Sequence, residues 1–260
     1  MADLAATLRS HRDAGRRVFV PYVTGGLAGV DADLLRGLED AGADAIEVGI
    51  PFSDPVMDGP VIQEASRRAL ESGATPFGVL ESIGRAGVEI PVAVMTYANP
   101  VWRSGHASFL QACVAAGVSG VIVPDLPVDE AEGWTRACAQ ASVAPVFLAA
   151  PGTSDHRLRA IGEASRGFVY CVATYGVTGA RERLAETAAE LVARLRPLTD
   201  RPLLVGVGIA EPSHAAEACG FADGVVVGSA LVRPLLEGDP AAALGLATGF
   251  RSVTRSQVHP

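Results

Sequence analysis

Residues 44–60 read DAIEVGIPFSDPVMDGP, and this stretch has the pattern of a β-strand that leads into a helix. Its first part, Ala45–Ile50, is a short apolar run with β-branched residues, which predicts a buried strand. The next part, Pro51–Pro60, is rich in proline, glycine and polar residues, which is typical of a loop. We therefore interpret the stretch as one strand–loop–helix unit.

Seven more apolar runs of this kind occur along the chain, and segments with apolar residues at i, i+3 and i+4 separate many of them. The predicted strands are Val18–Thr24, Ala45–Ile50, Val92–Thr96, Gly120–Pro124, Val146–Ala149, Phe168–Ala173, Leu203–Val207 and Gly224–Val227. The clearest predicted helices are Asp31–Ala41, Ala107–Ala116, Glu182–Leu195 and Ser213–Cys219.

Eight strands with intervening helices in 260 residues predict an α/β fold in which a parallel sheet closes into a (β/α)8 barrel, or TIM barrel. No linker divides the chain, so we expect a single domain over residues 1–260. Residues 2–14 are expected to form an extra N-terminal helix across the bottom of the barrel. A doubly wound open sheet is the structural alternative.

The composition indicates a protein with a large core and an acidic surface. Hydrophobic residues make up 49% of the chain and charged residues 19%, so disorder is not expected. The net charge of −8 argues against nucleic-acid binding, which needs a basic surface. The chain has no apolar run of membrane-spanning length and no secretory signal. Four cysteines without a C-x-x-C pair are typical of a reduced setting, so we expect a cytoplasmic protein.

The sequence contains no lysine, and all 21 Lys-plus-Arg positions are arginine. A Schiff base, attachment of pyridoxal phosphate and a P-loop all depend on a lysine amine. The five histidines show no metal-ligand spacing, so no metal site is expected either. The sequence therefore predicts chemistry that uses no cofactor.

One predicted strand carries a carboxylate between apolar residues. Side chains alternate along a strand, so Ile46 and Val48 are expected to face the outer helices while Glu47 faces the barrel interior. Burial there raises the pKa of a carboxyl group towards the range of proton transfer at neutral pH. Asp54 and Asp58 follow in the loop, where an aspartate before proline or glycine is also ordinary turn chemistry. Glu47 and Asp58 together resemble an acid–base pair, although Glu47 could also be a hydrogen-bonded structural residue.

Glycine-rich segments follow the predicted strands six, seven and eight. They are Gly176–Ala180, Val205–Ala210 and Val225–Ala230. Glycine lets the backbone approach an anion, and Ser229 lies where a short helix would begin. Barrel enzymes often hold a phosphate group at this face, so we expect phosphate-binding loops after strands six to eight. Tyr97, Tyr170 and Phe19 fall on strands and either line a pocket or fill the core.

Seven motifs follow one another along the chain. In order they are FVPYVTGG, IEVGIPFSDPVMDGPVIQ, MTYANPV, GVIVPDLP, GVTGAR, VGVGI and VVVGSALV. Together they closely resemble the tryptophan synthase α subunit family. The resemblance implies a lyase of tryptophan biosynthesis that cleaves indole-3-glycerol phosphate to indole and glyceraldehyde 3-phosphate by a retro-aldol reaction. It implies that Glu47 moves protons between carbon 3 of the indole ring and the glycerol hydroxyl. Asp58 would stabilise the positive charge that develops near the indole N–H.

The resemblance also implies further site residues and a partner. Phosphate contacts would fall on Gly179, Gly208, Gly228 and Ser229. The substrate pocket would include Tyr22, Tyr97 and Tyr170, and Thr178 would close over the substrate by bonding Asp54. The expected partner is a tryptophan synthase β subunit, which receives the indole in an α2β2 complex.

The chain departs from the family pattern in two loops. Leu27 stands where relatives usually carry an acidic residue, and Ala173–Tyr175 replaces a serine and another small or basic residue. These loops border the surface that would meet the β subunit and the lid that would close the site. A stand-alone lyase that releases free indole for a specialised pathway is therefore a second hypothesis. A non-catalytic barrel scaffold is a third, against which the intact acidic pair argues.

Overall fold

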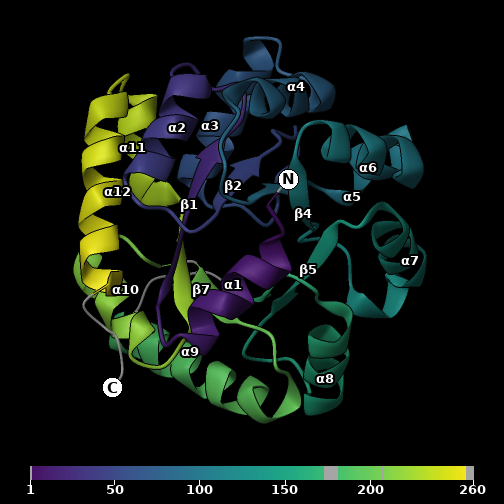
Figure 1. Cartoon of the computed structure of the whole chain (residues 1–260), viewed down its shortest axis with the longest axis vertical. Helices are drawn as coiled ribbons and strands as arrows, with labels where there is room; N and C mark the ends of the chain where they lie inside the picture. The colour runs from purple at the N-terminus through teal and green to yellow at the C-terminus, as the bar shows by residue number, and fades with distance from the viewer. Residues whose placement is uncertain (1, 173–180, 207, 256–260) are drawn as a thin grey trace.

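A computed structural model of the chain describes residues 2–172, 181–206 and 208–255. Its strands are all parallel and pair in chain order, and β1 also pairs with β8, so the sheet closes into a barrel (Figure 1). The strands are β1 (Val18–Thr24), β2 (Ile46–Gly49), β3 (Val92–Met95), β4 (Val118–Ile122), β5 (Ala144–Ala149), β6 (Val169–Val172), β7 (Leu203–Gly206) and β8 (Gly224–Val227). The predicted (β/α)8 barrel is confirmed, and the open-sheet alternative is wrong.

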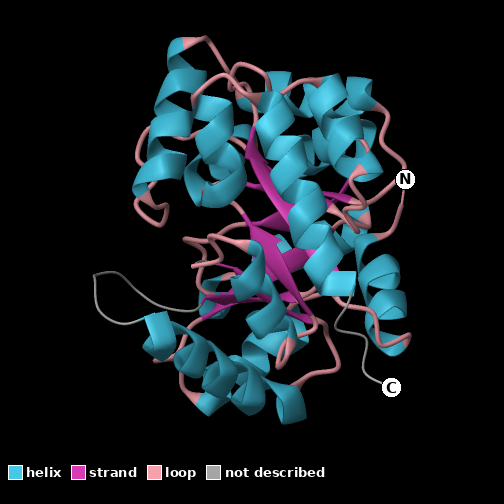
Figure 2. Ribbon diagram, turned by 90° about the vertical axis from the view of Figure 1, so that its left-hand side faces the viewer, coloured by secondary structure: helices cyan, strands magenta, loops and turns pink. Residues whose placement is uncertain are grey.

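Helices surround the barrel, and in the side view they enclose the strands (Figure 2). The α-helices are α1 (Leu4–Asp13), α2 (Ala32–Asp40), α3 (Pro60–Glu71), α4 (Pro76–Ala86), α5 (Ala98–Ser104), α6 (His106–Ala115), α7 (Glu132–Ala141), α8 (Asp155–Ala164), α9 (Arg181–Leu195), α10 (Pro212–Cys219), α11 (Ser229–Leu236) and α12 (Pro240–Arg255). The described residues also include the short 3-10 helices η1 (Val128–Glu130) and η2 (Arg196–Leu198). Strands covered in this way are buried on both faces, which is why they read as continuous apolar runs.

Two strand predictions differ from the structure by more than one residue at an end. The strand predicted at Gly120–Pro124 is β4, which begins at Val118 and ends at Ile122. Gly117 adopts a φ of 77° and ends the preceding helical turn, so the strand begins directly after it. Pro124 has no N–H to donate to a neighbouring strand and lies in the loop. The strand predicted from Val146 begins two residues earlier, at the first residue of β5.

The predicted N-terminal helix is α1, which lies across the open end of the barrel (Figure 1). Its N-cap, Asp3, accepts a 3.0 Å hydrogen bond from the N–H of Ala6. Leu4 is 1% exposed and fills the barrel mouth. A Cβ added to Gly120 or Gly167 would lie 2.4 Å or 2.7 Å from the Leu4 Cδ2 atom, so both glycines make room for this side chain.

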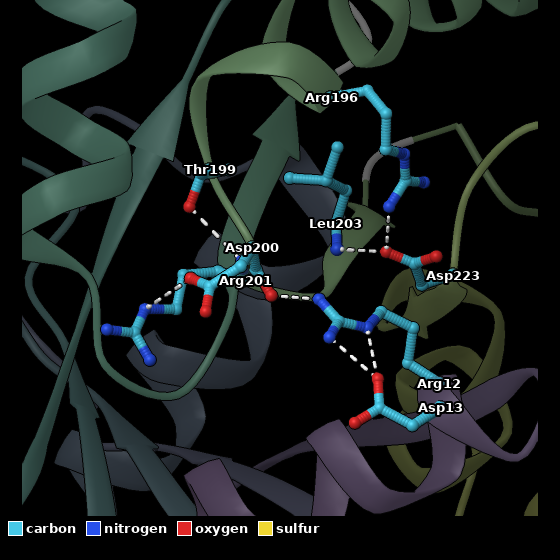
Figure 3. A network of polar contacts seen from close by, with 8 residues as sticks. All are labelled: Arg12, Asp13, Arg196, Thr199, Asp200, Arg201, Leu203 and Asp223. Atoms are coloured by element: carbon cyan, nitrogen blue, oxygen red, sulfur yellow. Dashed lines mark hydrogen bonds and ion pairs between the residues drawn. The ribbon is translucent and has the colours of Figure 1, made fainter.

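Buried carboxylates join neighbouring strands near the same end of the barrel. Asp44, just before β2, accepts a 2.8 Å bond from the N–H of Phe19 in β1 and a bidentate ion pair from Arg251 in α12. Asp223, just before β8, accepts a 2.7 Å bond from the N–H of Leu203 in β7 and pairs with Arg196 (Figure 3). Each carboxylate thus replaces a missing ladder contact where two strands begin.

The four cysteines, which we expected to be reduced, are free and buried, and they pack as small apolar side chains. The described helices include none that is long and apolar enough to cross a membrane. In the same part of the chain, no three His, Cys, Asp or Glu side chains are grouped so that they could hold a metal ion.

Candidate active site

Glu47 lies in the middle of β2 and is 1% exposed. It is in register with Tyr22 of β1 on one side and with Ala93 of β3 on the other. Among the described residues, neither of its carboxylate oxygens has a hydrogen-bond partner. Burial and, to a smaller extent, the charge of Asp58 raise the pKa of Glu47 to about 8. Glu47 is therefore mostly protonated at neutral pH and can donate a proton before it accepts one.

Asp58 lies in the loop between β2 and α3, next to Gly59, the N-cap of that helix. Its Oδ2 atom accepts a 3.1 Å hydrogen bond from the Tyr97 hydroxyl, and its N–H donates to the carbonyl oxygen of Pro55 at 3.0 Å. Burial raises the pKa of Asp58 to about 6, against the lowering effect of the Tyr97 bond. The pKa values of the two carboxyl groups thus lie on either side of neutral pH. Such a separation allows one carboxyl group to act as an acid and the other as an anion.

Two of the predicted pocket tyrosines, Tyr22 of β1 and Tyr170 of β6, lie against the last residue of the neighbouring strand. A Cβ on Gly49 would lie 2.0 Å from the Tyr22 hydroxyl, and one on Gly206 would lie 2.3 Å from the Tyr170 hydroxyl. The last residues of β2 and β7 must therefore be glycine for the rings to lie there. Burial raises the pKa of both phenols far above the ordinary value, and the charges of the site carboxylates add to this. Both hydroxyls are therefore protonated hydrogen-bond donors.

Tyr97 does not fall on a strand, contrary to the prediction. The strand β3 ends at Met95, and Tyr97 is the N-cap residue of α5. The N–H of Ala98, the first residue of α5, donates a 2.9 Å bond to Asp125 in the loop after β4, so the Asp125 side chain satisfies the start of this helix. The Tyr97 ring stacks on Phe52, with ring centroids 5.0 Å apart.

Sequence reasoning missed both Asp125 and Phe52. The position of Asp125, three residues after the last residue of β4, was a usable signal, because the loops after barrel strands form the active face. Phe52 gave no such signal, since nothing in the local pattern relates it to a tyrosine on the next unit.

The structure describes three of the four residues predicted to bind phosphate. Gly208 follows β7 with a φ of 85°, which only glycine adopts readily. Gly228 follows β8 and is the N-cap of α11, and the exposed Ser229 is the first residue of that helix. A Cβ on Gly228 would lie 3.4 Å from the ring of Tyr22, so this helix N-terminus adjoins the tyrosine pocket. Gly179 lies outside the described residues.

The residues predicted to form the lid are described only in part. Asp54 is exposed and accepts a 2.6 Å hydrogen bond from the hydroxyl of Ser53. Its predicted partner Thr178, and the departure at Ala173–Tyr175, lie outside the described residues. The other departure, Leu27, is 5% exposed and packs in the hydrophobic core rather than on a surface.

The chain is similar to known proteins over most of its length. The family model described as tryptophan synthase alpha chain matches residues 8–248. The tryptophan synthase alpha chain of Acaryochloris marina is 41% identical over 256 residues, which cover 96% of each chain. That of Alkalilimnicola ehrlichii is 45% identical over 237 residues, which cover 89% of this chain and 86% of the relative. A structure of Mycobacterium tuberculosis tryptophan synthase superposes with a TM-score of 0.88 at 39% identity, covering 98% of this chain and 99% of that one. The chain therefore belongs to the tryptophan synthase alpha chain family.

Proposed function

We propose that this lyase of tryptophan biosynthesis cleaves indole-3-glycerol phosphate with Glu47 and Asp58 as its catalytic residues. The observation that carries the proposal is the buried Glu47 carboxyl, whose oxygens have no partner among the described residues. A buried polar group without a partner costs free energy and needs an explanation, and a substrate that supplies the partner is one such explanation. The proximity of Asp58, whose charge raises the pKa of Glu47, supports a shared role.

The reaction requires that carbon 3 of the indole ring is protonated before the bond to the glycerol chain breaks, because an indole carbanion is a poor leaving group. Protonation places a positive charge on the ring nitrogen. The Asp58 carboxylate, charged above a pKa of about 6, would face the ring N–H and stabilise this charge. Its stabilisation is larger in the intermediate than in the neutral substrate, which is what lowers the barrier.

Glu47 would supply the proton to carbon 3, since its pKa of about 8 keeps it protonated at neutral pH. The resulting carboxylate would then take the proton of the glycerol hydroxyl next to the ring. As that O–H becomes the carbonyl of glyceraldehyde 3-phosphate, the carbon–carbon bond electrons return to the ring and restore neutral indole. Glu47 ends protonated, so no proton is gained or lost over the cycle.

The remaining site residues would position the substrate. Gly228 and Ser229 would hold the phosphate through backbone N–H groups at the N-terminus of α11, where the helix dipole favours an anion. Gly208, which follows β7, and Gly179 would contribute further N–H groups. Tyr22, Tyr97 and Tyr170 would border the indole and glycerol parts. Thr178 would close the site by bonding Asp54.

A β subunit is the proposed partner. The loop that carries Asp58 also carries Val56 and Met57, which are 79% and 42% exposed. Exposed apolar side chains beside a site favour a protein contact there. The structures of tryptophan synthase that the chain resembles support such a partner, and we propose the α2β2 form. Because Leu27 packs in the core, it gives no reason to favour a stand-alone lyase. We also propose that the chain works as one domain in the cytoplasm.

The test is the release of indole from indole-3-glycerol phosphate by the purified chain, with and without a β subunit. Stimulation by the β subunit would support the conventional role. Fast turnover without stimulation would support the stand-alone lyase, and no indole in either assay would contradict the proposed reaction.

A further inference from the structure

Tyr97 makes three contacts with the loop that carries Asp58. Its ring stacks on Phe52 near the start of the loop, with centroids 5.0 Å apart. Its hydroxyl oxygen accepts the N–H of Met57 at 3.0 Å, and its O–H donates to Asp58 Oδ2 at 3.1 Å. Tyr97 belongs to the unit after β3, whereas the loop follows β2, so these contacts join two neighbouring units of the barrel.

The direction of the bond to Asp58 is fixed by the chemistry of the three groups. The Met57 N–H can only donate, so it occupies a lone pair of the phenol oxygen. The phenol has one proton, and a carboxylate can only accept, so that proton points at Asp58. Tyr97 itself is held in place because the next residue, Ala98, donates its N–H to Asp125 at 2.9 Å.

We infer that Tyr97 is a positioning residue for the reaction, and that its phenol fixes the orientation of the Asp58 carboxylate and holds it as an anion towards the indole N–H. The inference rests on the proposed role of Asp58. It gives Tyr97 a function that acts through Asp58, rather than through contact with the indole ring alone.

The charge of Asp58 is a balance between two opposing effects. Burial favours the neutral acid, and the hydrogen bond from Tyr97 favours the carboxylate. The pKa of Tyr97 is itself raised by burial and by the charge of Asp58, so the phenol remains a donor over the working pH range. Removing the hydroxyl leaves burial unopposed, which raises the pKa of Asp58 further.

The first experiment compares Tyr97→Phe with the unaltered chain in kcat and KM for indole-3-glycerol phosphate across pH. In Tyr97→Phe, the acid limb of kcat/KM should move to higher pH by about one unit, because the buried Asp58 carboxylate loses the hydrogen bond that stabilises its charge. The loss of activity in this variant should fall mainly on kcat, because the Asp58 carboxylate stabilises a positive charge that develops only after the substrate has bound.

The matched control is Phe52→Leu, which weakens the ring contact but keeps the phenol. Its acid limb should stay where it is in the unaltered chain, even if the rate falls because the loop is less well held. Replacing Tyr97 by a ring-fluorinated tyrosine, whose O–H is a stronger donor, should move the acid limb in the opposite direction.

A second measurement does not depend on turnover. NMR titration of carboxyl-labelled aspartates in the resting protein, with Asp58 assigned through Asp58→Asn, should show a higher Asp58 pKa in Tyr97→Phe. An unmoved Asp58 titration in a folded Tyr97→Phe variant would overturn the inference. If instead Asp58→Asn keeps full activity, the proposed role of Asp58 itself fails, and the two failures are thus distinguishable.

Discussion

At the scale of single residues, the site depends on two carboxyl groups that burial affects to different degrees. Glu47 lies within a strand and lacks a partner among the described residues, so burial raises its pKa to about 8. Asp58 lies in a loop and accepts the Tyr97 hydroxyl, so its pKa rises only to about 6. Position in the barrel therefore makes one carboxyl group, Glu47, neutral and the other, Asp58, anionic at neutral pH.

The pH dependence of kcat/KM should follow from these values. Activity should rise as Asp58 ionises near pH 6 and fall as Glu47 loses its proton near pH 8, giving a bell with its maximum near neutrality. Asp58→Asn and Glu47→Gln should each lower turnover by at least about 100-fold. Steady-state kinetics across pH measure both effects. A flat profile, or full activity in either variant, would contradict the assigned roles.

The stability of the protein should also depend on Glu47. The folded state binds this proton more tightly than the unfolded chain, whose carboxyl has the ordinary value of 4.5. The contribution of Glu47 to the free energy of unfolding is therefore complete below pH 4.5 and is lost as the pH rises to about 8. The loss should be roughly 1.4 kcal/mol per pH unit within that window, as an upper value.

Urea unfolding at several pH values, compared between the unaltered chain and Glu47→Gln, isolates the contribution of Glu47 to the free energy of unfolding. Residue 47 of the variant cannot titrate, so the free energy of unfolding of the variant should increase with pH relative to that of the unaltered chain. A difference that stays constant between about pH 5 and about pH 8 would falsify the raised pKa.

At the scale of elements, the ends of strands and the starts of helices carry the predicted contacts with substrate. The loop between β2 and α3 holds Asp58, and the N-terminus of α11 holds Ser229. Free N–H groups in the first turn of a helix attract anions. The short connection after β8 therefore has the character of a phosphate site before any ligand is considered.

Ser229→Asp should weaken substrate binding, because it places a second negative charge where the phosphate would lie. A repulsion of about 1.4 kcal/mol would raise KM by roughly tenfold. The comparison is with Ser10→Asp, which adds the same charge on the exposed face of α1 at the opposite end of the barrel and should leave KM unchanged. Equal KM values for the two variants would argue against a phosphate site at α11.

At the scale of the whole molecule, one ion pair links the first and last parts of the chain. Arg251 of α12 is 8% exposed and makes a bidentate pair with Asp44, at 2.8 Å and 2.9 Å. It also donates to the carbonyl oxygen of Arg17, and Asp44 lies 2.9 Å from His11 Nδ1 of α1. The pair thus holds α12 against the starts of β1 and β2.

Arg251→Ala should lower the free energy of unfolding by about 3–5 kcal/mol, because it leaves the buried Asp44 carboxylate without its main partner. Chemical denaturation measures the effect. The control is Arg136→Ala, which breaks an exposed pair with Glu132 and should cost less than about 1 kcal/mol. Similar losses in both variants would mean that the buried pair does not stabilise the closed barrel.

Local pattern was sufficient to predict the fold and the burial of Glu47. Each strand of the barrel is short, apolar and separated from the next by a helix, so its position could be read from a few neighbouring residues. The burial of Glu47 followed from strand alternation, since the residues on either side of it are apolar. The start of α11 at Ser229 followed from a glycine that ends an apolar run.

Contacts between units were decided only by the tertiary structure. Tyr97 was expected on a strand, and its position as a helix N-cap depends on Asp125, 28 residues further along the chain. The Tyr97–Asp58 bond joins residues 39 positions apart, and the Arg251–Asp44 pair joins residues 207 apart. Periodicity reports which face of its own element a side chain occupies. Periodicity contains no information about which side chain of another element will contact it, because that depends on how the whole sheet closes.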